Sequence, residues 1–438
     1  MSAINNISSN SELPHYWEEV QLQDLLDDYQ NGFAFSSEDY VENGIPIISM
    51  GNISLDGKFQ FDYSNAKKWK KESLNDLQSY IIEKGDVIIA MTDVTPTKNL
   101  IGRMAFVSSN GPFLLNQRVG LLRINEEKAE SKFVYYVGNT KQWIKYCKSI
   151  ATQGAQANIS TKDIKKGLVL LPPKNEQQKI AEILSNVDEK IEVIEEKISK
   201  TQELKKGLMQ RVLTRGIGHN EFKESSLGSI PKTWEVKNLA SLGEFSKGKG
   251  ISKSQLSEKG LPCIRYGEIY TTHHFVIKQF HSFIDEEIAK QSQPLSKNDL
   301  LFAGSGETVD EIGKCVAYLG DEEAYAGGDI IILSPTNADS LYLSYCLNSD
   351  IIIKQRRKFG QGNAVVHIYA ASLGKLMVPM PPKEEQKQIA RIFSLLDNKI
   401  DVLEEKRSKF LRLKQGLMQQ LLTGKIRVNS LLQKEILA

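Results

Sequence analysis

A long internal repeat divides the chain into two halves. Residues 172–214 and 381–423 align without a gap at a constant offset of 209, and 26 of the 43 aligned positions are identical. The segments before each copy align loosely, but landmarks recur in the same order: Trp17-Glu18-Glu19-Val20 with Trp234-Glu235-Val236, Lys84-Gly85-Asp86-Val87 with Lys297-Asn298-Asp299-Leu300, Ile101-Gly102-Arg103 with Ile312-Gly313-Lys314, and Gln153-Gly154 with Gln361-Gly362. The repeat predicts one duplicated scaffold that carries two divergent blocks, 1–171 and 218–380.

The repeated segments, 172–217 and 381–438 with its tail, predict long helices. Apolar residues alternate at spacings of four and three, which is typical of a coiled-coil seam. The predicted seam consists of Ile180, Leu184, Val187, Ile191, Ile194, Ile198, Ile389, Phe393, Leu396, Ile400 and Leu403. Pro-Pro precedes each helix, and Gly216 and Gly424 suit left-handed caps at the ends.

Two such helices in one chain pair most simply with each other, as an intramolecular antiparallel coiled coil with a pseudo-two-fold internal repeat. Association between separate chains is the alternative. Gly207 and Gly416 lie inside the pattern, where they mark either close packing or a bend.

The divergent blocks predict α+β domains. Short apolar runs at 45–49, 86–90, 119–124, 299–303 and 330–333 are typical of strands, whereas 131–149 and 340–358 are typical of helices. The opening residues lack the pattern of a secretory signal, and nowhere do about 18 apolar residues run together. Cys147, Cys263, Cys315 and Cys346 form no Cys-x-x-Cys pair. We therefore expect a cytoplasmic protein without a metal, a cofactor or a membrane span.

Two copies of Pro-Pro-x-x-Glu-Gln-x-x-Ile-Ala, at residues 172–181 and 381–390, each open a heptad helix that follows a divergent block. This arrangement resembles the specificity (S) subunit of type I restriction-modification enzymes over the whole chain. The resemblance implies two target-recognition domains, 1–171 and 218–380, that each read one half of a split target in double-stranded DNA. It further implies that the paired helices set the spacer and dock two methyltransferase (M) subunits, that restriction and translocase (R) subunits join them, and that the chain itself catalyses nothing.

Each block carries two more acidic than basic residues, so any phosphate-binding surface must be local. The preferred candidates are basic helix ends that lead to Gly/Gln/Asn loops, because cations bind phosphates and amides pair with base edges. They are Lys145, Lys148, Gln153, Gly154, Gln156 and Asn158 in the first block, and Lys354, Arg356, Arg357, Lys358, Gln361, Gly362 and Asn363 in the second. The alternative is an ordinary solvated charge run beside a turn.

Three further sites are weaker candidates. Arg265, at the end of a predicted strand, suits a guanine edge, and Tyr266 beside it suits either DNA contact or packing. The cluster Lys67-Lys68-Trp69-Lys70-Lys71 and the loop Lys247-Gly248-Lys249-Gly250 suit either a phosphate or plain surface.

An enzyme, such as a DNA methyltransferase, is the competing class of function, and a coiled-coil adaptor is a third. Phe302-Ala303-Gly304-Ser305-Gly306 has the form of a cofactor loop, but the aligned Ile89-Ala90-Met91-Thr92-Asp93 has no glycine, so a tight turn is the better interpretation. His273 and His274 would point to opposite faces of a strand, which makes shared metal ligation awkward. Purification with and without an M subunit separates the three classes.

Overall fold

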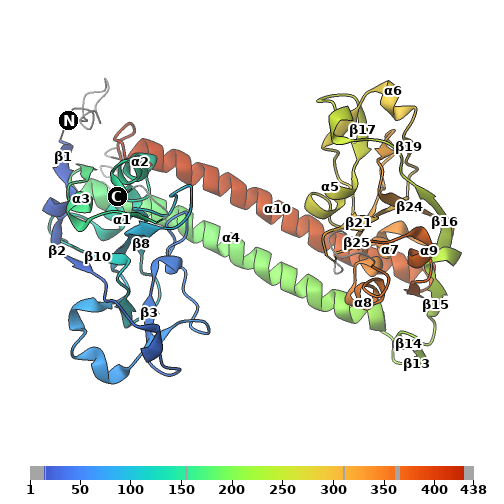
Figure 1. Cartoon of the computed structure of the whole chain (residues 1–438), viewed down its shortest axis with the longest axis horizontal. Helices are drawn as coiled ribbons and strands as arrows, with labels where there is room; N and C mark the ends of the chain where they lie inside the picture. Colours follow the sequence, from blue (N-terminus) through green and yellow to red (C-terminus); the bar gives the residue numbers. More distant parts are fainter. Residues whose placement is uncertain (1–13, 15, 153–155, 309–310, 361–365, 429–438) are drawn as a thin grey trace, which may run out of the picture. The chain divides into compact units, whose positions relative to one another are not determined.

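The structure is a computed structural model that describes residues 14, 16–152, 156–308, 311–360 and 366–428. It contains two compact units: Met1–Val193 with Lys406–Ala438 form unit 1, and Ile194–Glu405 form unit 2. The boundaries fall within the helices α4 (Lys174–Arg215) and α10 (Lys383–Leu421), so each unit holds one divergent block and a part of both helices (Figure 1). Both units mix strands and helices, as the α+β prediction requires. Within the described residues, no helix is long and apolar enough to cross a membrane.

Unit 1 is built from short strands and helices that precede α4. Its strands are β1 (Glu18–Gln21), β2 (Leu26–Asn31), β3 (Ile45–Ile48), β4 (Lys68–Trp69), β5 (Ile81–Ile82), β6 (Val87–Ala90), β7 (Thr92–Asp93), β8 (Met104–Phe106), β9 (Phe113–Leu115), β10 (Val119–Ile124), β11 (Ala157–Asn158) and β12 (Leu168–Leu171). Its shorter helices are α1 (Ser131–Val137), α2 (Lys141–Ile150) and α3 (Thr161–Lys165). The sheets have the orders β2-β10-β6-β8, β4-β3-β9-β5, β1-β12 and β11-β7.

Unit 2 repeats this plan. Its strands are β13 (Phe222–Ser225), β14 (Gly228–Pro231), β15 (Glu235–Asn238), β16 (Gly243–Lys247), β17 (Leu261–Ile264), β18 (Ser282–Ile284), β19 (Gln293–Pro294), β20 (Leu300–Ala303), β21 (Ser305–Gly306), β22 (Cys315–Ala317), β23 (Tyr325–Ala326), β24 (Ile330–Pro335), β25 (Val366–His367) and β26 (Met377–Met380). Its shorter helices are α5 (Tyr266–Thr271), α6 (Glu286–Ala289), α7 (Ser340–Leu347), α8 (Asp350–Arg356) and α9 (Ala370–Leu373). The orders β16-β24-β20-β22, β18-β17-β23-β19, β15-β26 and β21-β25 match those of unit 1 strand by strand, and the hairpin β13-β14 is additional.

The central four-stranded sheet of each unit is buried on both faces. Along β20, Leu300 and Phe302 enter the cluster that contains the helices, whereas Leu301 and Ala303 enter the cluster against the second sheet. Alternate side chains of a strand point to opposite faces, so a continuous apolar run serves both cores. The predicted strands at 86–90, 119–124, 299–303 and 330–333 coincide with β6, β10, β20 and β24 for this reason.

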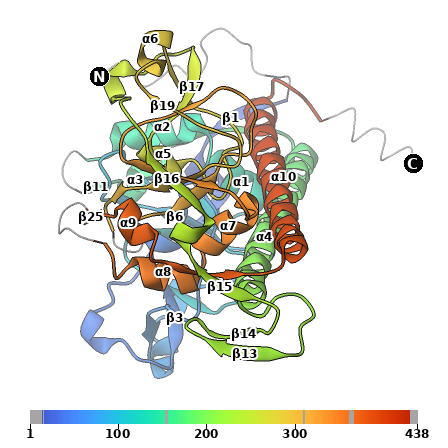
Figure 2. The same cartoon turned by 90° about the vertical axis from the view of Figure 1, so that its right-hand side faces the viewer.

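The two long helices pack against each other within each unit. In unit 1, Leu184 near the start of α4 shares a hydrophobic cluster with Leu421 at the end of α10. In unit 2, Leu213 near the end of α4 shares a cluster with Phe393 near the start of α10, where α7 also packs (Figure 2). Of the predicted seam, Ile180, Leu184, Val187, Ile191, Ile194, Ile198, Ile389 and Phe393 are buried, and Leu396, Ile400 and Leu403 are half-buried.

The ends of the long helices agree with the sequence, but some interior details differ. Gly216 and Gly424 have φ angles of 65° and 71°, which confirms the left-handed caps. A Cβ on Gly207 or Gly416 would meet nothing within 4 Å among the described residues, so of the two alternatives close packing is not what these glycines serve within this chain. The predicted helices 131–149 and 340–358 are each divided into two helices by a turn.

Candidate nucleic-acid interface

The basic helix end predicted in unit 1 is only partly available to a ligand. Lys145 on α2 is exposed, but Lys148 donates from Nζ to Thr97 O at 3.0 Å and to Asn99 Oδ1 at 2.7 Å. Gln156 is half-buried, and Asn158 is exposed in β11. Gln153 and Gly154 lie outside the described residues.

The basic run of unit 2 is divided between the surface and the core. Lys354, Arg357 and Lys358 are exposed at the end of α8. Arg356 is 2% exposed and donates from Nη1 to the carbonyl oxygen of Gly313. Burial lowers the pKa of Arg356 to about 10. A buried guanidinium cannot reach a phosphate, so the prediction was wrong for this residue. Gln361, Gly362 and Asn363 lie outside the described residues.

Arg265 and Tyr266 stand where β17 passes into α5. Arg265 is half-buried, and its backbone N–H donates to the buried carboxylate of Glu268 at 2.8 Å. Tyr266 is 40% exposed, so it is not a packed core residue. Both residues line a cavity of about 600 Å³ in unit 2.

The other basic clusters combine lysines that are exposed, namely Lys67, Lys70, Lys71, Lys247 and Lys249, with residues that support the fold. Lys67 lies over the ring of Tyr40, Lys68 donates to Glu42 O at 3.1 Å, and Trp69 packs against a hydrophobic cluster. In the loop 247–250, a Cβ on Gly248 would lie 2.0 Å from the carbonyl oxygen of Gly327, so this glycine allows two backbones to touch.

The motifs that suggested catalysis have structural explanations. Gly304 lies in a bend between β20 and β21, where its amide donates to Asp329 O at 2.7 Å and a Cβ would lie 2.9 Å from the same oxygen, so the glycine allows two distant backbone segments to approach closely. His273 and His274 lie in an irregular segment, which corrects the prediction of a strand. Burial, together with His281, lowers the pKa of His273 to about 4. Among the described residues, no group of three or more His, Cys, Asp or Glu is placed to hold a metal ion.

Sequence reasoning missed a triad of side chains that connects each block to the long helices. In unit 1, Tyr136 OH donates to Asp188 Oδ2 at 2.8 Å, and Lys414 Nζ lies 2.7 Å from Asp188 Oδ1. The Lys414 ammonium also lies over the ring of Tyr136. A tyrosine of α1, an aspartate of α4 and a lysine of α10 therefore meet at one point.

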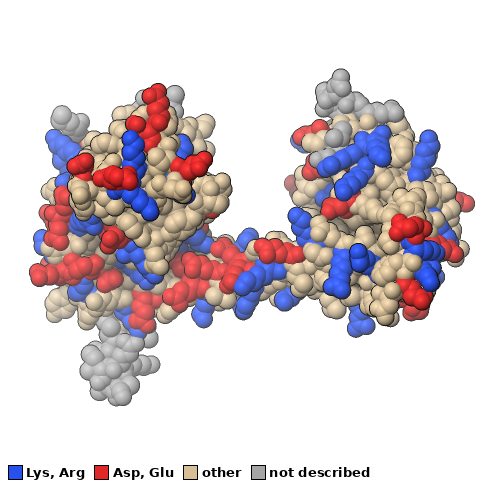
Figure 3. Space-filling model, turned by 90° about the horizontal axis from the view of Figure 1, so that it is seen from below, with Lys and Arg blue, Asp and Glu red and all other residues tan. Residues whose placement is uncertain are grey.

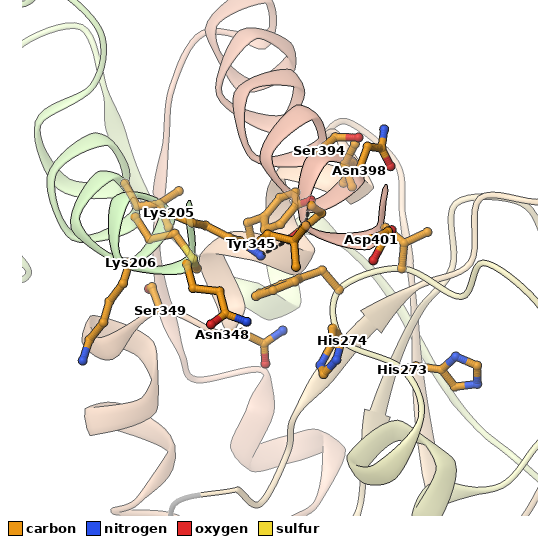
Figure 4. A pocket seen from close by; sticks show the side chains of 18 of the residues that line it. Lys205, Lys206, His273, His274, Tyr345, Asn348, Ser349, Ser394, Asn398 and Asp401 are labelled. Carbon is orange, nitrogen blue, oxygen red and sulfur yellow. Dashed lines mark hydrogen bonds and ion pairs between the residues drawn. The ribbon is translucent and has the colours of Figure 1, made fainter. Parts of the chain in front are cut away.

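Unit 2 contains the equivalent triad with the roles of the helices exchanged. Tyr345 OH donates to Asp397 Oδ2 at 2.6 Å, and Lys205 forms an ion pair with Asp397. Figure 4 shows Tyr345 and Lys205 side by side where α7 and α4 converge. Lys205 also lies 3.8 Å from the ring centre of Phe275, and burial lowers its pKa. The triad borders a groove of about 1490 Å³ that His273 and His274 also line.

The glutamate and glutamine of the repeated signature anchor each block to the start of its helix. Glu176 accepts from Trp17 Nε1 at 3.1 Å, and Glu385 accepts from Trp234 Nε1 at 2.9 Å. The side-chain oxygens of Gln177 and Gln386 accept from the backbone amides of Glu130 and Asp339, in both cases at 2.9 Å. Both contacts occur in each unit, so the glutamate and the glutamine of the signature attach each block to the start of its long helix.

The missed residues carry a signal in the sequence. Tyr136 and Tyr345 are separated by 209 residues, as are Asp188 and Asp397, and Lys205 and Lys414. Extending the offset of the helix repeat upstream into the blocks would have shown the tyrosine pair. The exposed faces carry no such marker, because on the face shown in Figure 3 both basic and acidic residues occur on each unit and along the helices.

Both units have the same α+β arrangement, and each contacts both long helices. One chain therefore presents two related domains on a shared pair of helices. Comparison with known proteins identifies the family of the chain. The model of the type I restriction modification DNA specificity domain matches residues 14–203 and 231–411, one copy for each half. The chain belongs to this family. It is a DNA sequence-recognition subunit and not an enzyme in its own right.

Named relatives agree over nearly the full length. The chain is 28% identical over 432 residues to a Methanocaldococcus jannaschii protein named for the specificity subunit of type I restriction enzyme MjaX, covering 96% of each chain. It is 25% identical over 442 residues to the type I restriction enzyme MjaVIII specificity subunit of the same organism, covering 96% of this chain and 95% of the relative. The solved structure of a type I restriction-modification S subunit from M. genitalium has the same fold, with a TM-score of 0.61 at 17% identity, covering 95% of this chain and 98% of that one.

Proposed function

We propose that this chain reads a bipartite target in double-stranded DNA as the specificity subunit of a type I restriction-modification complex. In this proposal residues 1–171 and 218–380 are the two target-recognition domains, and each reads one half-site. The helix of residues 172–217 and the helix of residues 381–438, the second of which ends in a tail, form an intramolecular antiparallel coiled coil that sets the spacer. The observation that carries the proposal is the matching sheet order of two blocks whose sequences have diverged.

The contacts within each unit support the helix pairing. In unit 1, Leu184 shares a cluster with Leu421 and Asp188 contacts Lys414, so residue numbers fall along α10 as they rise along α4, which means that the two helices are antiparallel. In unit 2, Lys205 contacts Asp397, and Ile217 donates to Glu385. An approximate two-fold relation suits duplex DNA, because readers about one helical turn, roughly 34–36 Å, apart meet the same groove on one face.

The DNA-binding surface that we propose follows the exposed members of the predicted basic runs. Lys145 and Asn158 belong to it in unit 1, and Lys354, Arg357 and Lys358 belong to it in unit 2. Because DNA is the substrate, we place the complex in the cytoplasm. R subunits complete it for cleavage.

The assembled complex is expected to show sequence-specific binding that the isolated chain lacks. With a DNA methyltransferase subunit, the chain should bind one duplex sequence and direct methylation to both half-sites, while showing no turnover alone. Changing Lys354, Arg357 and Lys358 together to alanine should weaken binding to all sequences alike and reduce the slope of log affinity against log salt by about one for each lost phosphate contact.

The matched control is Lys237→Ala on β15, whose side chain is exposed and paired with Glu235. It should leave affinity and salt response unchanged. Sequence-independent binding by the assembled wild-type complex would contradict the recognition role, and a flat response of the triple variant would exclude the end of α8 from the interface.

The long helices also offer equivalent apolar residues for two M subunits. Val193 and Leu413 of unit 1 are exposed, and so are Val402 and Leu204 of unit 2, which occupy the same positions in the repeat. Large exposed apolar side chains at duplicated positions suit two copies of one partner. We propose that each pair contributes to docking one M subunit.

Val193→Ser with Leu413→Ser should therefore weaken the binding of one M subunit about tenfold to a hundredfold, and Val402→Ser with Leu204→Ser should weaken the other. Native mass spectrometry at limiting concentration should show the loss of one M subunit in each double variant. Retention of two M subunits by both variants would place the docking surface elsewhere.

A further inference from the structure

A second cavity of unit 2 lies at the edge where two parallel strands end. β17 and β23 pair in parallel, with Ile264 opposite Ala326, and Arg265 and Asp329 follow the ends of these strands. The loop 250–255 closes the third side. The cavity has a volume of about 600 Å³ and is lined by Ile251, Lys253, Gln255, Arg265, Tyr266 and Asp329 together with glycines of all three segments.

Backbone contacts hold the three segments together. The amide of Gly328 donates to Gly250 O at 2.8 Å, and the amide of Gly327 donates to Ile264 O at 2.8 Å. The amide of Gly248 donates to Ile330 O at 2.9 Å. A Cβ on Gly248 would lie 2.0 Å from the carbonyl oxygen of Gly327, so this glycine allows two of the segments to approach closely.

Two residues at the cavity hold unfavourable backbone conformations. Ile251 has a φ of 62° and Asp329 has a φ of 59°. The left-handed region costs a residue with a Cβ about 1–2 kcal/mol, and it is rare for a β-branched side chain such as isoleucine. Such strain collects at binding and catalytic sites, where the surrounding structure maintains it. Here it occurs on two of the three segments that form one cavity.

The polar groups at the cavity include a donor directly after β17 and an acceptor between β23 and β24, besides Ser252, Lys253 and Gln255. Arg265 Nε is buried and has no hydrogen-bond partner among the described residues. Asp329 is exposed, and its carboxylate accepts hydrogen bonds. In the major groove, guanine presents the acceptors O6 and N7, and its paired cytosine presents the N4 donor. An arginine and an aspartate that line one cavity therefore offer the donor and the acceptor that the two edges of one G·C pair require.

We propose that this cavity reads a G·C base pair in the half-site of unit 2, with the Arg265 guanidinium donating to guanine O6 and N7 and the Asp329 carboxylate accepting from cytosine N4. Tyr266 contacts the neighbouring base. The inference rests on the proposed reading of one half-site by each unit and adds the identity of a base pair. Ser49 stands at the position of Arg265 in unit 1, so the other half-site is read by different chemistry.

The test uses the complex of the full chain with M subunits. Methylated sites are mapped in wild-type and variant complexes, and binding is measured on duplexes that carry each base pair at every position. In the wild type, one half-site should contain an invariant G·C pair. Arg265→Ala should reduce the affinity of the complex for that target about tenfold to a hundredfold. The variant complex should also bind duplexes with other base pairs at that position, while its specificity for the other half-site stays unchanged.

Two more conservative variants test the same proposal if Arg265→Ala impairs folding. Arg265→Lys retains the charge but lacks the planar fork, so specificity at the G·C pair should fall more than overall affinity. Asp329→Asn suits the left-handed backbone and should relax specificity at the same pair. Lys237→Ala serves again as the control and should leave the mapped site unchanged.

The outcomes distinguish this inference from the function on which it rests. If the wild-type complex recognises no defined sequence, the proposed function fails. If the wild type reads a bipartite site, but Arg265→Lys and Asp329→Asn fold and leave its sequence and affinity unchanged, the proposed function stands and the cavity does not read a base pair.

Discussion

Asp397→Ala is expected to destabilise unit 2 by about 3–5 kcal/mol. The change would leave the largely buried ammonium group of Lys205 without its carboxylate, and breaking a buried ion pair from one side costs that much because the remaining charge is not solvated. It would also remove the acceptor of the Tyr345 hydroxyl. Urea unfolding followed by hydrogen exchange should show the loss in the peptides of α7 and the adjoining parts of α4 and α10.

Three variants separate the ion pair from general damage to the site. Tyr345→Phe removes one hydrogen bond and should cost about 1 kcal/mol. Lys205→Met together with Asp397→Leu replaces the pair by apolar groups and should recover most of the stability lost in Asp397→Ala. Asp188→Ala should produce the matching loss in unit 1. A loss in the double variant equal to the sum of the losses in its two single variants would show that Lys205 and Asp397 contribute to stability independently.

The long helices were the most predictable part of the fold. Their seam and caps follow from local rules. A spacing of four and three places Ile180 and Leu184 on one helix face, and a glycine after the last turn adopts the left-handed backbone conformation without a steric clash. The apolar runs that became β6, β10, β20 and β24 were equally clear. The two-residue strands β4, β5, β19 and β23 were not predicted, because pairing with distant neighbours defines them and no local pattern marks them.

The residues of the candidate site were predicted less well than the helices. Which basic residue of a helix reaches the surface depends on the helix face on which it lies. Arg356 and Arg357 are adjacent in sequence, but Arg356 lies one turn after the buried Ile352 and shares its inward face. The spacing of four was present in the sequence and would have placed Arg356 inside. The cavity around Arg265 is a different case, because it joins segments that are some 60 residues apart and depends on backbone contacts between glycines.

Glu176→Ala is expected to destabilise unit 1 by about 3–5 kcal/mol. Glu176 is 1% exposed and binds the Arg427 guanidinium in a bidentate pair, with Nε to Oε1 at 2.7 Å and Nη2 to Oε2 at 2.8 Å. The same carboxylate accepts from the indole N–H of Trp17. Its removal would leave two donors without their shared acceptor, and a charged donor costs more than a neutral one.

Glu176→Gln retains an acceptor for Trp17 but loses the charge, so it should cost about half as much, and Arg427→Met in the wild-type background should cost less than Glu176→Ala. Hydrogen exchange should rise near Trp17 in Glu176→Ala, because the indole holds the first described residues of the block against α4. In unit 2, Glu385 binds Trp234, His219 and the Ile217 amide but no arginine of the described residues, so Glu385→Ala should cost less than Glu176→Ala. A larger loss in unit 2 would mean that the indole contact, and not the bidentate ion pair, provides most of the stability at the start of each long helix.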